Sequence, residues 1–352
     1  MTEKKPVIAI IGGGDTSEYQ VSLRSAAGVC SFIDPEKFTP YIVRMHGLDW
    51  QVVLPDCTDA LGSHPATVSE TDAKPERTVP VDRNDFSFVL PDGQRVRFDF
   101  AYITIHGTPG EDGRLQGYLD MLHIPYSCCG VLAAALTYNK FACNQFLARF
   151  GLRIAESVML RRGQHIDDDK VQQLVGLPCF VKPNLGGSSF GVTKVKTADQ
   201  IQPAIAKAFE EAPEVLIEAF MDGKELTCGC YKTRRRTVVF PLTEVVSHNE
   251  YFDYEAKYNG QSDEITPARV SEDVAARVSQ LTSAIYDLIG ARGIIRVDYI
   301  VTDEGRCINL LEVNTTPGMT ATSFIPQQVR AAGMDIREVM TEIIEDGLII
   351  DN

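Results

Sequence analysis

The sequence predicts an α/β protein with additional α+β elements, in which an N-terminal unit is built on a parallel sheet. Apolar runs and helical patterns alternate at the start of the 352-residue chain. Val7 to Ile11 indicates a buried strand, Val21 to Ile33 has helical spacing, and Phe38 to Met45 indicates a second strand. Asp99 to Ile105 is a further buried strand. Strands that alternate with helices are typical of parallel sheets, so residues 1–128 are expected to form one unit.

The composition is that of a large acidic globular protein. The chain is 44% hydrophobic and long enough for two or three packed domains, and its net charge is −14. An acidic chain argues against general binding to nucleic acid or to a membrane surface, because both need basic patches. A polyphosphate ligand would therefore be held by a few placed Lys and Arg side chains and a metal ion.

The cysteines and the N-terminus indicate the compartment. The nine cysteines show neither a disulfide framework nor metal-ligand spacing, so Cys128–Cys129 and Cys228-x-Cys230 are expected to be reduced thiols in or near the core. The first apolar run, which ends at Ile11, is too short for a signal peptide or a membrane span. We therefore expect a cytoplasmic protein.

Two further units follow, residues 129–221 and 222–352. The second unit is predicted to alternate helices with strands, and the third to combine strands with an amphipathic helix that ends at Gly290. The predicted elements of the second unit are a helical stretch over 131–150, strands over 178–183, 192–196 and 214–220, and a helix over 198–211. Residues 50–98 of the first unit are less regular, with short strands.

A predicted β-hairpin in the third unit carries polar groups. Its strands, 293–301 and 307–314, are joined by an Asp/Gly turn. Side chains alternate sides of a strand, so Arg296 shares a face with Asp298, and Glu312 shares a face with Asn314. Two carboxylates and one amide suit Mg²⁺, although a solvated hairpin edge would look the same.

A Gly-rich loop, Gly186 to Gly191, lies between two predicted strands. Val192 stands where a Walker loop has its lysine, so the loop is better described as a flap that could close over phosphates, or as an ordinary hairpin. Lys182 precedes it in an apolar strand, where a lysine is rare unless it is paired. Lys140 is a second candidate for a phosphate, or a surface lysine whose stem packs on apolar neighbours.

Other candidate site residues remain open at this stage. Glu218 and Glu225 flank the crossing into the third unit and could accept hydrogen bonds from a nucleoside or be solvated. His106 follows a strand, where ligands of α/β sheets bind, but could instead be a core or capping histidine. The stretch from Tyr251 to Tyr258 is either a lid or a satellite core. A dinucleotide site at Gly12–Gly14 is disfavoured, because Ser17 replaces the third glycine.

Taken in order, these motifs resemble the ATP-grasp superfamily and specifically the D-alanine–D-alanine ligase family. The resemblance runs through nearly the whole chain. Its motifs are Ser17-Glu18 with Val21-Ser22-Leu23, His106-Gly107, Gly110-Glu-Asp-Gly-x-Leu-Gln-Gly117, Val181-Lys-Pro183, Gly187-Ser-Ser189, Tyr254-Glu-Ala-Lys-Tyr258, Arg296-x-Asp298 and Leu311-Glu-x-Asn-Thr-x-Pro-Gly-Met319.

The resemblance implies a three-domain ATP-grasp fold that holds ATP between the second and third domains. It implies two Mg²⁺ ions, which Mn²⁺ may replace, on Asp298, Glu312 and Asn314. It assigns the ATP contacts to Lys140, Lys182, Ser188, Ser189, Glu218, Phe220, Glu225 and Lys257. It assigns substrate binding to Glu18, His106, Ser323 and Phe324, and catalysis to Glu18, Ser188, Tyr258, Arg296 and the Gly318 amide.

The implied activity is ATP-dependent joining of two D-alanine molecules through a D-alanyl phosphate, for peptidoglycan precursor synthesis. Tyr258 is the lid aromatic of relatives that use D-alanine as the second substrate. Three positions depart from the family pattern: Gly186 replaces a frequent Glu, Phe252 a frequent Tyr, and Gln20 a frequent acid. A homodimer without nucleic-acid or membrane partners is expected.

Three alternative functions remain open. The first is a ligase of the same superfamily that uses D-serine or D-lactate. The second is a nucleotide-binding regulator without activity, and the third is a nicotinamide-dependent dehydrogenase. The acids at 298 and 312 argue against the regulator, and the incomplete glycine fingerprint argues against the dehydrogenase.

Overall fold

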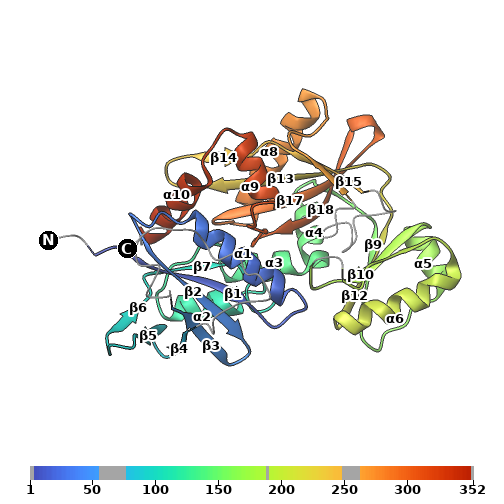
Figure 1. Cartoon of the computed structure of the whole chain (residues 1–352). Helices are drawn as coiled ribbons and strands as arrows, with labels where there is room; N and C mark the ends of the chain where they lie inside the picture. The colour runs from blue at the N-terminus through green and yellow to red at the C-terminus, as the bar shows by residue number, and fades with distance from the viewer. Residues whose placement is uncertain (1–3, 55–76, 188–189, 248–261, 350–352) are drawn as a thin grey trace.

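The computed structural model describes residues 4–54, 77–187, 190–247 and 262–349. It contains three sheets (Figure 1). The N-terminal unit lies beside the central unit, and the C-terminal sheet lies above both (Figure 1). Among the helices of the described residues, none combines the length and apolar character needed to span a lipid bilayer.

The N-terminal sheet has the order β6-β5-β4-β3-β2-β1-β7. Among the described residues of this sheet, β1 makes the predicted parallel pairs, with β2 and β7. The strands within 49–53 and 78–97 extend the sheet as antiparallel pairs. The elements are β1 (Val7–Gly13), α1 (Tyr19–Phe32), β2 (Thr39–His46), β3 (Asp49–Val53), β4 (Thr78–Asp82), β5 (Ser87–Val89), β6 (Arg95–Arg97), β7 (Phe100–Ile103) and α2 (Arg114–Met121).

The first strand differs from its predicted end. It continues through Gly12 and Gly13, and the chain turns only at Gly14. Gly13 has φ +108° and Gly14 has φ +104°, which L side chains rarely adopt. A Cβ on Gly13 would also lie 2.2 Å from the Met45 carbonyl oxygen, so this close parallel approach requires glycine.

The central sheet is entirely antiparallel, with the order β11-β10-β12-β9, and its apolar cluster is separate from the others. Its elements are β9 (Ser157–Arg161), α5 (Asp168–Val175), β10 (Cys179–Pro183), β11 (Thr193–Val195), the 3₁₀ turn η1 (Ala198–Gln200), α6 (Ile201–Glu211) and β12 (Glu214–Ala219). β10, β11, β12 and the long helix lie within the predicted ranges, whereas β9 and α5 were not predicted.

The helical stretch predicted over residues 131–150 consists of two helices in the structure. They are α3 (Val131–Tyr138) and α4 (Lys140–Ala148). Asn139 has extended backbone angles (φ −88°, ψ 97°), and its side-chain oxygen accepts a hydrogen bond from the Ala142 amide. Asn139 therefore ends one helix and caps the next, which places Lys140 in the first turn of α4.

The C-terminal sheet contains the predicted hairpin at its centre and has the order β16-β15-β13-β17-β18-β8. Helix α8 covers one face and begins at the Ser271 cap. It ends before Gly290, as predicted. The elements are β8 (Arg153–Ile154), β13 (Lys224–Lys232), β14 (Thr237–Val239), β15 (Thr243–Ser247), β16 (Ser262–Ile265), α8 (Glu272–Leu288), β17 (Ile294–Thr302), the 3₁₀ turn η2 (Asp303–Gly305), β18 (Cys307–Asn314), α9 (Phe324–Ala331) and α10 (Ile336–Leu348).

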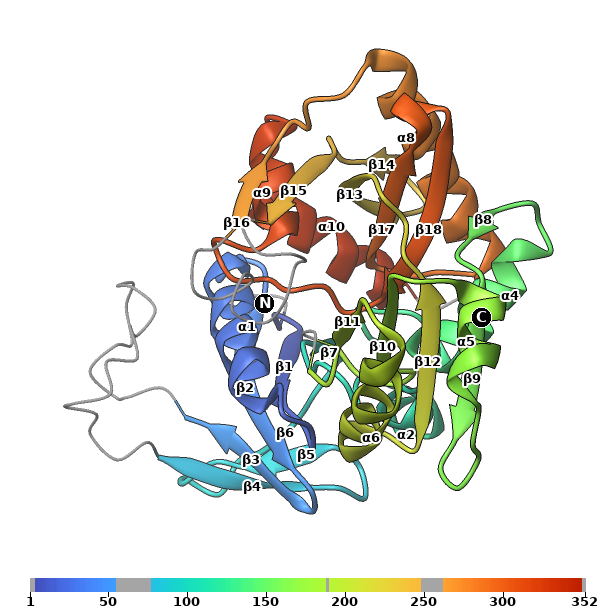
Figure 2. The same cartoon turned by 90° about the vertical axis from the view of Figure 1, so that its right-hand side faces the viewer.

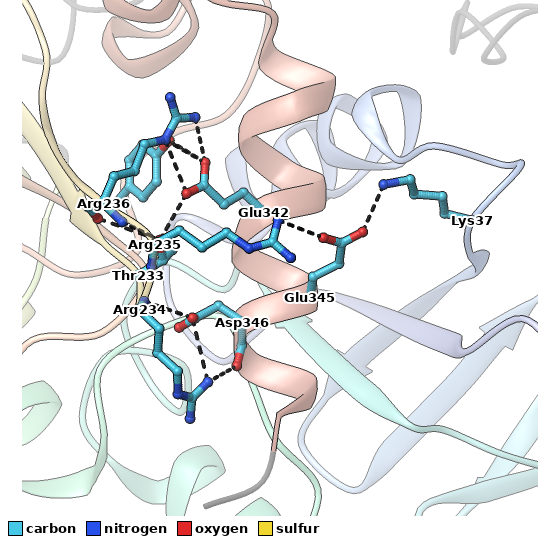
Figure 3. Close-up of polar contacts among 9 residues, drawn as sticks. Lys37, Thr233, Arg234, Arg235, Arg236, Glu342, Glu345 and Asp346 are labelled. Carbon is cyan, nitrogen blue, oxygen red and sulfur yellow. Dashed lines mark hydrogen bonds and ion pairs between the residues drawn. The ribbon is translucent and has the colours of Figure 1, made fainter.

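Helix α10 connects the N-terminal and C-terminal units. Its apolar face joins a buried cluster that contains Ile8 and Phe100 from the first sheet and Tyr231 from the third. Its polar face is held by charged residues (Figure 3). Arg236 donates to both oxygens of Glu342, and this pair lies beside the Tyr231 hydroxyl, which also donates to Glu342.

A second set of charges extends this contact to the first unit. Glu345 of α10 lies 3.3 Å from the Arg235 guanidinium and 2.8 Å from the Lys37 ammonium (Figure 3). Lys37 follows α1 of the N-terminal unit. Each of these ion pairs is exposed and is expected to add little to the free energy of the contact between the two units. The apolar cluster therefore provides most of that stabilisation.

Candidate active site

All three units contribute to one large cavity of about 1030 Å³. The cavity is lined by residues of β10 and β12 in the central sheet and of β13, β17 and β18 in the C-terminal sheet. Figure 2 shows β17 and β18 above β10 and β12. The cavity is lined by every predicted site residue that the structure describes: Glu18, His106, Lys140, Lys182, Glu218, Phe220, Glu225, Arg296, Asp298, Glu312, Asn314, Gly318, Ser323 and Phe324. Ser188, Ser189, Phe252, Lys257 and Tyr258 lie outside the described residues.

The polar groups of the hairpin meet in register across two strands. Arg296 pairs with Asn314, and Asp298 pairs with Glu312. The register shifts at a bulge directly after Asp298. Because paired residues of adjacent strands point to the same face, all four side chains face the cavity, as the period-two pattern predicts.

The Asp298 carboxylate accepts four hydrogen bonds from its neighbours in the cavity. Arg296 donates to its two oxygens at 2.9 and 2.8 Å, and the Asn314 amide donates at 3.0 Å. Thr227, paired with Asp298 on β13, donates from its hydroxyl at 2.5 Å. Burial opposes the charge of Arg296, but the adjacent Asp298 carboxylate outweighs this and raises the guanidinium pKa above its usual value.

Lys140 connects the glycine flap to the hairpin. Its ammonium donates to the Gly186 carbonyl and lies 3.5 Å from a Glu312 oxygen. The helix break at Asn139 makes this possible, since it aims the first turn of α4 at the cavity. The flap and the acidic hairpin therefore face each other across the same space.

Lys182 and Glu218 form an ion pair on adjacent strands of the central sheet. Both are almost fully buried, at 8% and 5% exposure, so each charge depends on the other. Phe220 follows the second strand, with the Lys194 ammonium 3.9 Å above its ring and Phe180 beside it. This corner offers an aromatic face, a cation and a carboxylate, which suits a purine nucleotide.

Glu18 precedes α1 and is 5% exposed. A Cβ added to Gly187 of the flap would lie 2.8 Å from a Glu18 oxygen, so the flap backbone passes very close to this carboxylate. His106 is also buried, and its Nε2 lies 3.1 Å from the Ser25 hydroxyl of α1. Both residues border the cavity from the N-terminal unit.

Glu111 joins the N-terminal unit to the loop after β18. It accepts a hydrogen bond from the Gly107 amide at 2.8 Å and from the Thr316 hydroxyl at 2.7 Å. Burial raises the pKa of the Glu111 carboxyl, while His106 counteracts this. These bonds fix the segment that continues to Gly318.

Gly318, Ser323 and Phe324 lie together at the N-terminus of α9. A Cβ on Gly318 would lie 3.0 Å from the Ser323 hydroxyl oxygen. The same hydroxyl accepts from the Thr320 amide at 3.1 Å. The Arg296 guanidinium stands 5.3 Å over the Phe324 ring. The N-terminus of α9 thus lies beside Arg296, an arrangement that favours an anion.

Further residues that the sequence predictions did not assign to the site also line the cavity, among them Glu111, Lys194, Thr227 and Glu264. Glu111 lies within the Gly110–Gly117 motif, and Thr227 lies two residues after Glu225 and so on the same strand face. The sequence could therefore have assigned both residues to the site. Lys194 and Glu264 lie in short strands of mixed polarity, where nothing in the sequence separates them from surface residues.

Comparisons with known proteins cover both ends of the chain. Residues 7–129 match the family model described as D-ala D-ala ligase N-terminus, and residues 146–345 match D-ala D-ala ligase C-terminus. A D-alanine–D-alanine ligase of Bacteroides fragilis strain YCH46 is 69% identical over 96% of this chain and 98% of its own. One from Porphyromonas gingivalis strain W83 is 52% identical over 98% of both chains.

Solved structures show the same fold. D-alanyl-alanine synthetase A of Vibrio cholerae is similar with a TM-score of 0.83, at 27% identity over 99% of this chain and 100% of its own. The VanG D-Ala:D-Ser ligase of Enterococcus faecalis has a TM-score of 0.81, at 29% identity over 97% of this chain and 99% of its own. The predicted α/β fold with ATP-grasp architecture is confirmed by these neighbours.

Proposed function

This chain belongs to the D-alanine–D-alanine ligase family, and we propose that it joins two D-alanine molecules into D-alanyl-D-alanine with hydrolysis of ATP to ADP and phosphate. The observation that carries the proposal is the single cavity in which a nucleotide corner, an acidic hairpin and an anion-binding helix end meet. The product would serve peptidoglycan precursor synthesis, and we infer that the enzyme works in the cytoplasm.

The nucleotide would lie between the central unit, residues 129–221, and the C-terminal unit, residues 222–352. Lys140 and Lys182 would hold its phosphates, exchanging their present carboxylate partners for phosphate oxygens. Phe220 would pack on the base, and Glu218 and Glu225 would accept from the adenosine. Ser188, Ser189 and Lys257 would complete the phosphate contacts.

Asp298, Glu312 and Asn314 would hold two Mg²⁺ ions, which Mn²⁺ may replace. Their donor atoms are all oxygens and face one cavity, as Mg²⁺ requires. Within the described part of the chain no three His, Cys, Asp or Glu side chains are placed to share a metal, so the Asn314 amide would be needed. Its oxygen becomes available if the amide turns, because its nitrogen now faces Asp298. Bound Mg²⁺ would neutralise phosphate charge.

The first D-alanine would lie at the N-terminal unit, residues 1–128. Glu18 would bind its ammonium group, and His106 would border it. Its carboxylate would attack the γ-phosphorus of ATP, forming a carbon–oxygen–phosphorus link and releasing ADP. Lys140 and Lys182 would position the phosphates for this step, and such positioning supplies most of the catalysis in phosphoryl transfer.

The second D-alanine would lie at the start of α9, with its carboxylate on Ser323 and with Phe324 beside it. Its amine would attack the acyl carbonyl, and the carbon–oxygen bond to phosphate would break. Arg296 and the Gly318 amide would stabilise the oxyanion that forms in between. Glu18, Ser188 and Tyr258 would link the lid to the site and exclude water from the acyl phosphate.

Phosphate release tests the proposal directly. ATP is supplied with D-alanine, L-alanine, D-serine or D-lactate, and the product is identified by mass spectrometry. D-alanine alone should support release and give D-alanyl-D-alanine. A mixed product with D-serine at equal concentrations would favour the D-serine activity that the name of the E. faecalis neighbour states, and no amino-acid-dependent release would overturn the enzyme assignment.

We further infer a homodimer that acts on small molecules and binds neither nucleic acid nor membrane. Leu132 of α3 is 81% exposed and Met121 of α2 is 75% exposed. Such large apolar side chains on two contacting helices are suited to an interface. Light scattering of the wild type and of Leu132→Glu tests this: a dimer that becomes monomeric supports it, and a monomeric wild type contradicts it.

A further inference from the structure

One carboxylate of the cavity, Glu264, has no role in the mechanism above. It lies on β16 opposite Val245 of β15, which in turn lies opposite Glu225 of β13. Residues in one row of a sheet share a face, so Glu264 points to the same side as Glu225. It is half-buried and borders the cavity.

Glu264 is joined to the start of α9 through one amide. The Gln327 side-chain nitrogen donates to Glu264 at 2.5 Å and to the Thr322 carbonyl at 2.7 Å. Phe324 lies one turn before Gln327 and is therefore on the same helix face. The Arg296 guanidinium stands over its ring. Glu264 is thus next to the place proposed for the carboxylate of the second amino acid.

The charge environment of Glu264 differs from that of four other carboxylates in the cavity. Those four lie within salt-bridge distance of a cation: Glu218 with Lys182, Glu244 with Arg269, Asp298 with Arg296 and Glu312 with Lys140. Considering only described residues, Glu264 has a single hydrogen-bond partner, the neutral amide of Gln327. Burial raises the pKa of the Glu264 carboxyl, and the more distant Arg296 partly offsets this.

A zwitterionic amino acid needs both an anion-binding and a cation-binding group, close together. Ser323, Arg296 and the first turn of α9 can provide the first. Glu264 lies near them and, among the described residues, has the neutral Gln327 amide as its hydrogen-bond partner instead of a cation. The second amino acid also arrives as an ammonium ion, which has no lone pair and must lose a proton before it can attack.

We propose that Glu264 binds the ammonium group of the second amino acid and accepts its proton. The inference rests on the proposed function. The proton passes from nitrogen to a Glu264 oxygen, and the nitrogen lone pair then forms the bond to the acyl carbon. The electrons of the carbon–oxygen bond leave with phosphate. The second amine proton passes to the departing phosphate as the tetrahedral adduct collapses to the amide, so charge and atoms balance.

Hydroxylamine separates this role from a structural one. It is mostly uncharged at neutral pH and attacks acyl phosphates without needing a base. In Glu264→Gln, hydroxamate formation from ATP, D-alanine and hydroxylamine should continue near the wild-type rate. Dipeptide formation should fall about 10²-fold or more, which is the usual contribution of a general base. The matched control is Asp263→Asn, which removes a neighbouring exposed carboxylate and should leave both rates unchanged.

The outcomes distinguish the two proposals. If the wild type forms no dipeptide, the proposed function fails. If the wild type is active and Glu264→Gln forms dipeptide at the wild-type rate, the role of Glu264 is overturned. Equal loss of hydroxamate and dipeptide would also overturn it, because the acyl phosphate itself would then be affected.

The pH dependence provides a second readout. The groups that face Glu264 are Arg296 from β17, Gln327 from α9 and, in the same row, Glu225 from β13. The wild-type rate at limiting D-alanine should rise with pH as Glu264 loses its proton. Glu264→Gln should lose this rise in the dipeptide reaction and keep the wild-type profile with hydroxylamine.

Discussion

Arg296 holds both carboxylate oxygens of Asp298, at 2.9 and 2.8 Å, two residues along the same strand. With Thr227 and Asn314 also donating, the two oxygens of Asp298 accept four hydrogen bonds. A proposed metal ligand and a proposed oxyanion donor are therefore one charge-neutral unit. Changes to either should affect both metal binding and catalysis.

Replacing Arg296 with lysine keeps the charge but loses the planar pair of donors. Lysine cannot hold two carboxylate oxygens in a fixed fork, so both Asp298 and the oxyanion would be less well oriented. We expect kcat to fall by ~10²–10³, the usual cost of losing one such donor. Steady-state kinetics measure this, and a variant within error of wild type would exclude Arg296 from the reaction.

Glu312→Gln should remove most of the activity by weakening metal binding. The amide keeps the shape but loses the charge that faces Lys140 at 3.5 Å. Titration of Mn²⁺ by electron paramagnetic resonance should show weaker binding in the presence of nucleotide. Glu304→Gln, in the exposed turn of the same hairpin, is the control. Near-normal activity of Glu312→Gln at low Mg²⁺ would refute the metal assignment.

Thr227→Val should change the position of Asp298 without changing the packing volume. The hydroxyl is buried and donates to the carboxylate, and a hydrogen bond to a charged group contributes about 1.5–3 kcal/mol. We expect the free energy of unfolding to fall by about 1.5 kcal/mol and the Mg²⁺ concentration for half-maximal activity to rise. Thr227→Ser restores the donor, so failure of serine to recover either value would contradict this explanation.

Asn139→Ala tests the helix break that orients Lys140. The lost cap should cost about 1 kcal/mol of unfolding free energy, measured with urea. The KM for ATP should rise, since the first turn of α4 would fray. Asn139→Asp retains a capping oxygen and serves as the control. An unchanged KM in the alanine variant would show that Lys140 is oriented by other contacts.

The ion pairs of Glu244 should make the free energy of unfolding depend on pH in the acid range. Hydrogen bonds from Arg269, and then from Lys224, lower the pKa of the Glu244 carboxyl to about 2, although burial opposes this. Its folded pKa lies below the unfolded value of about 4.3, so the stabilisation is complete above that pH and is lost as pH falls towards 2.

Glu244→Gln should therefore lower the free energy of unfolding by about 2 kcal/mol at pH 7, a value reduced for the exposure of both cations. The loss should be smaller at pH 3. Urea denaturation at both pH values measures the difference, and an equal loss at the two would exclude the ion pairs as its cause.

The sequence by itself determined what depends on local periodicity. The alternation in 293–301 and 307–314 was enough to place Arg296 with Asp298 and Glu312 with Asn314, because the side-chain period of a strand is always two. The apolar stripe of α8 and the glycine that ends it, Gly290, were likewise predictable from neighbouring residues in the sequence. The motif order identified the family, and from it the fold.

Only the tertiary structure decided how these local faces meet. The pairing of Lys182 with Glu218, the contact of Gly187 with Glu18 and the row from Glu264 to Glu225 join segments that are far apart in the chain. Strand register and packing between units depend on long-range burial, which no short window contains. The break at Asn139 could not be predicted from the sequence for a related reason. The capping oxygen of Asn139 also accepts a hydrogen bond from Asn184, which precedes the flap and comes near only when the chain folds.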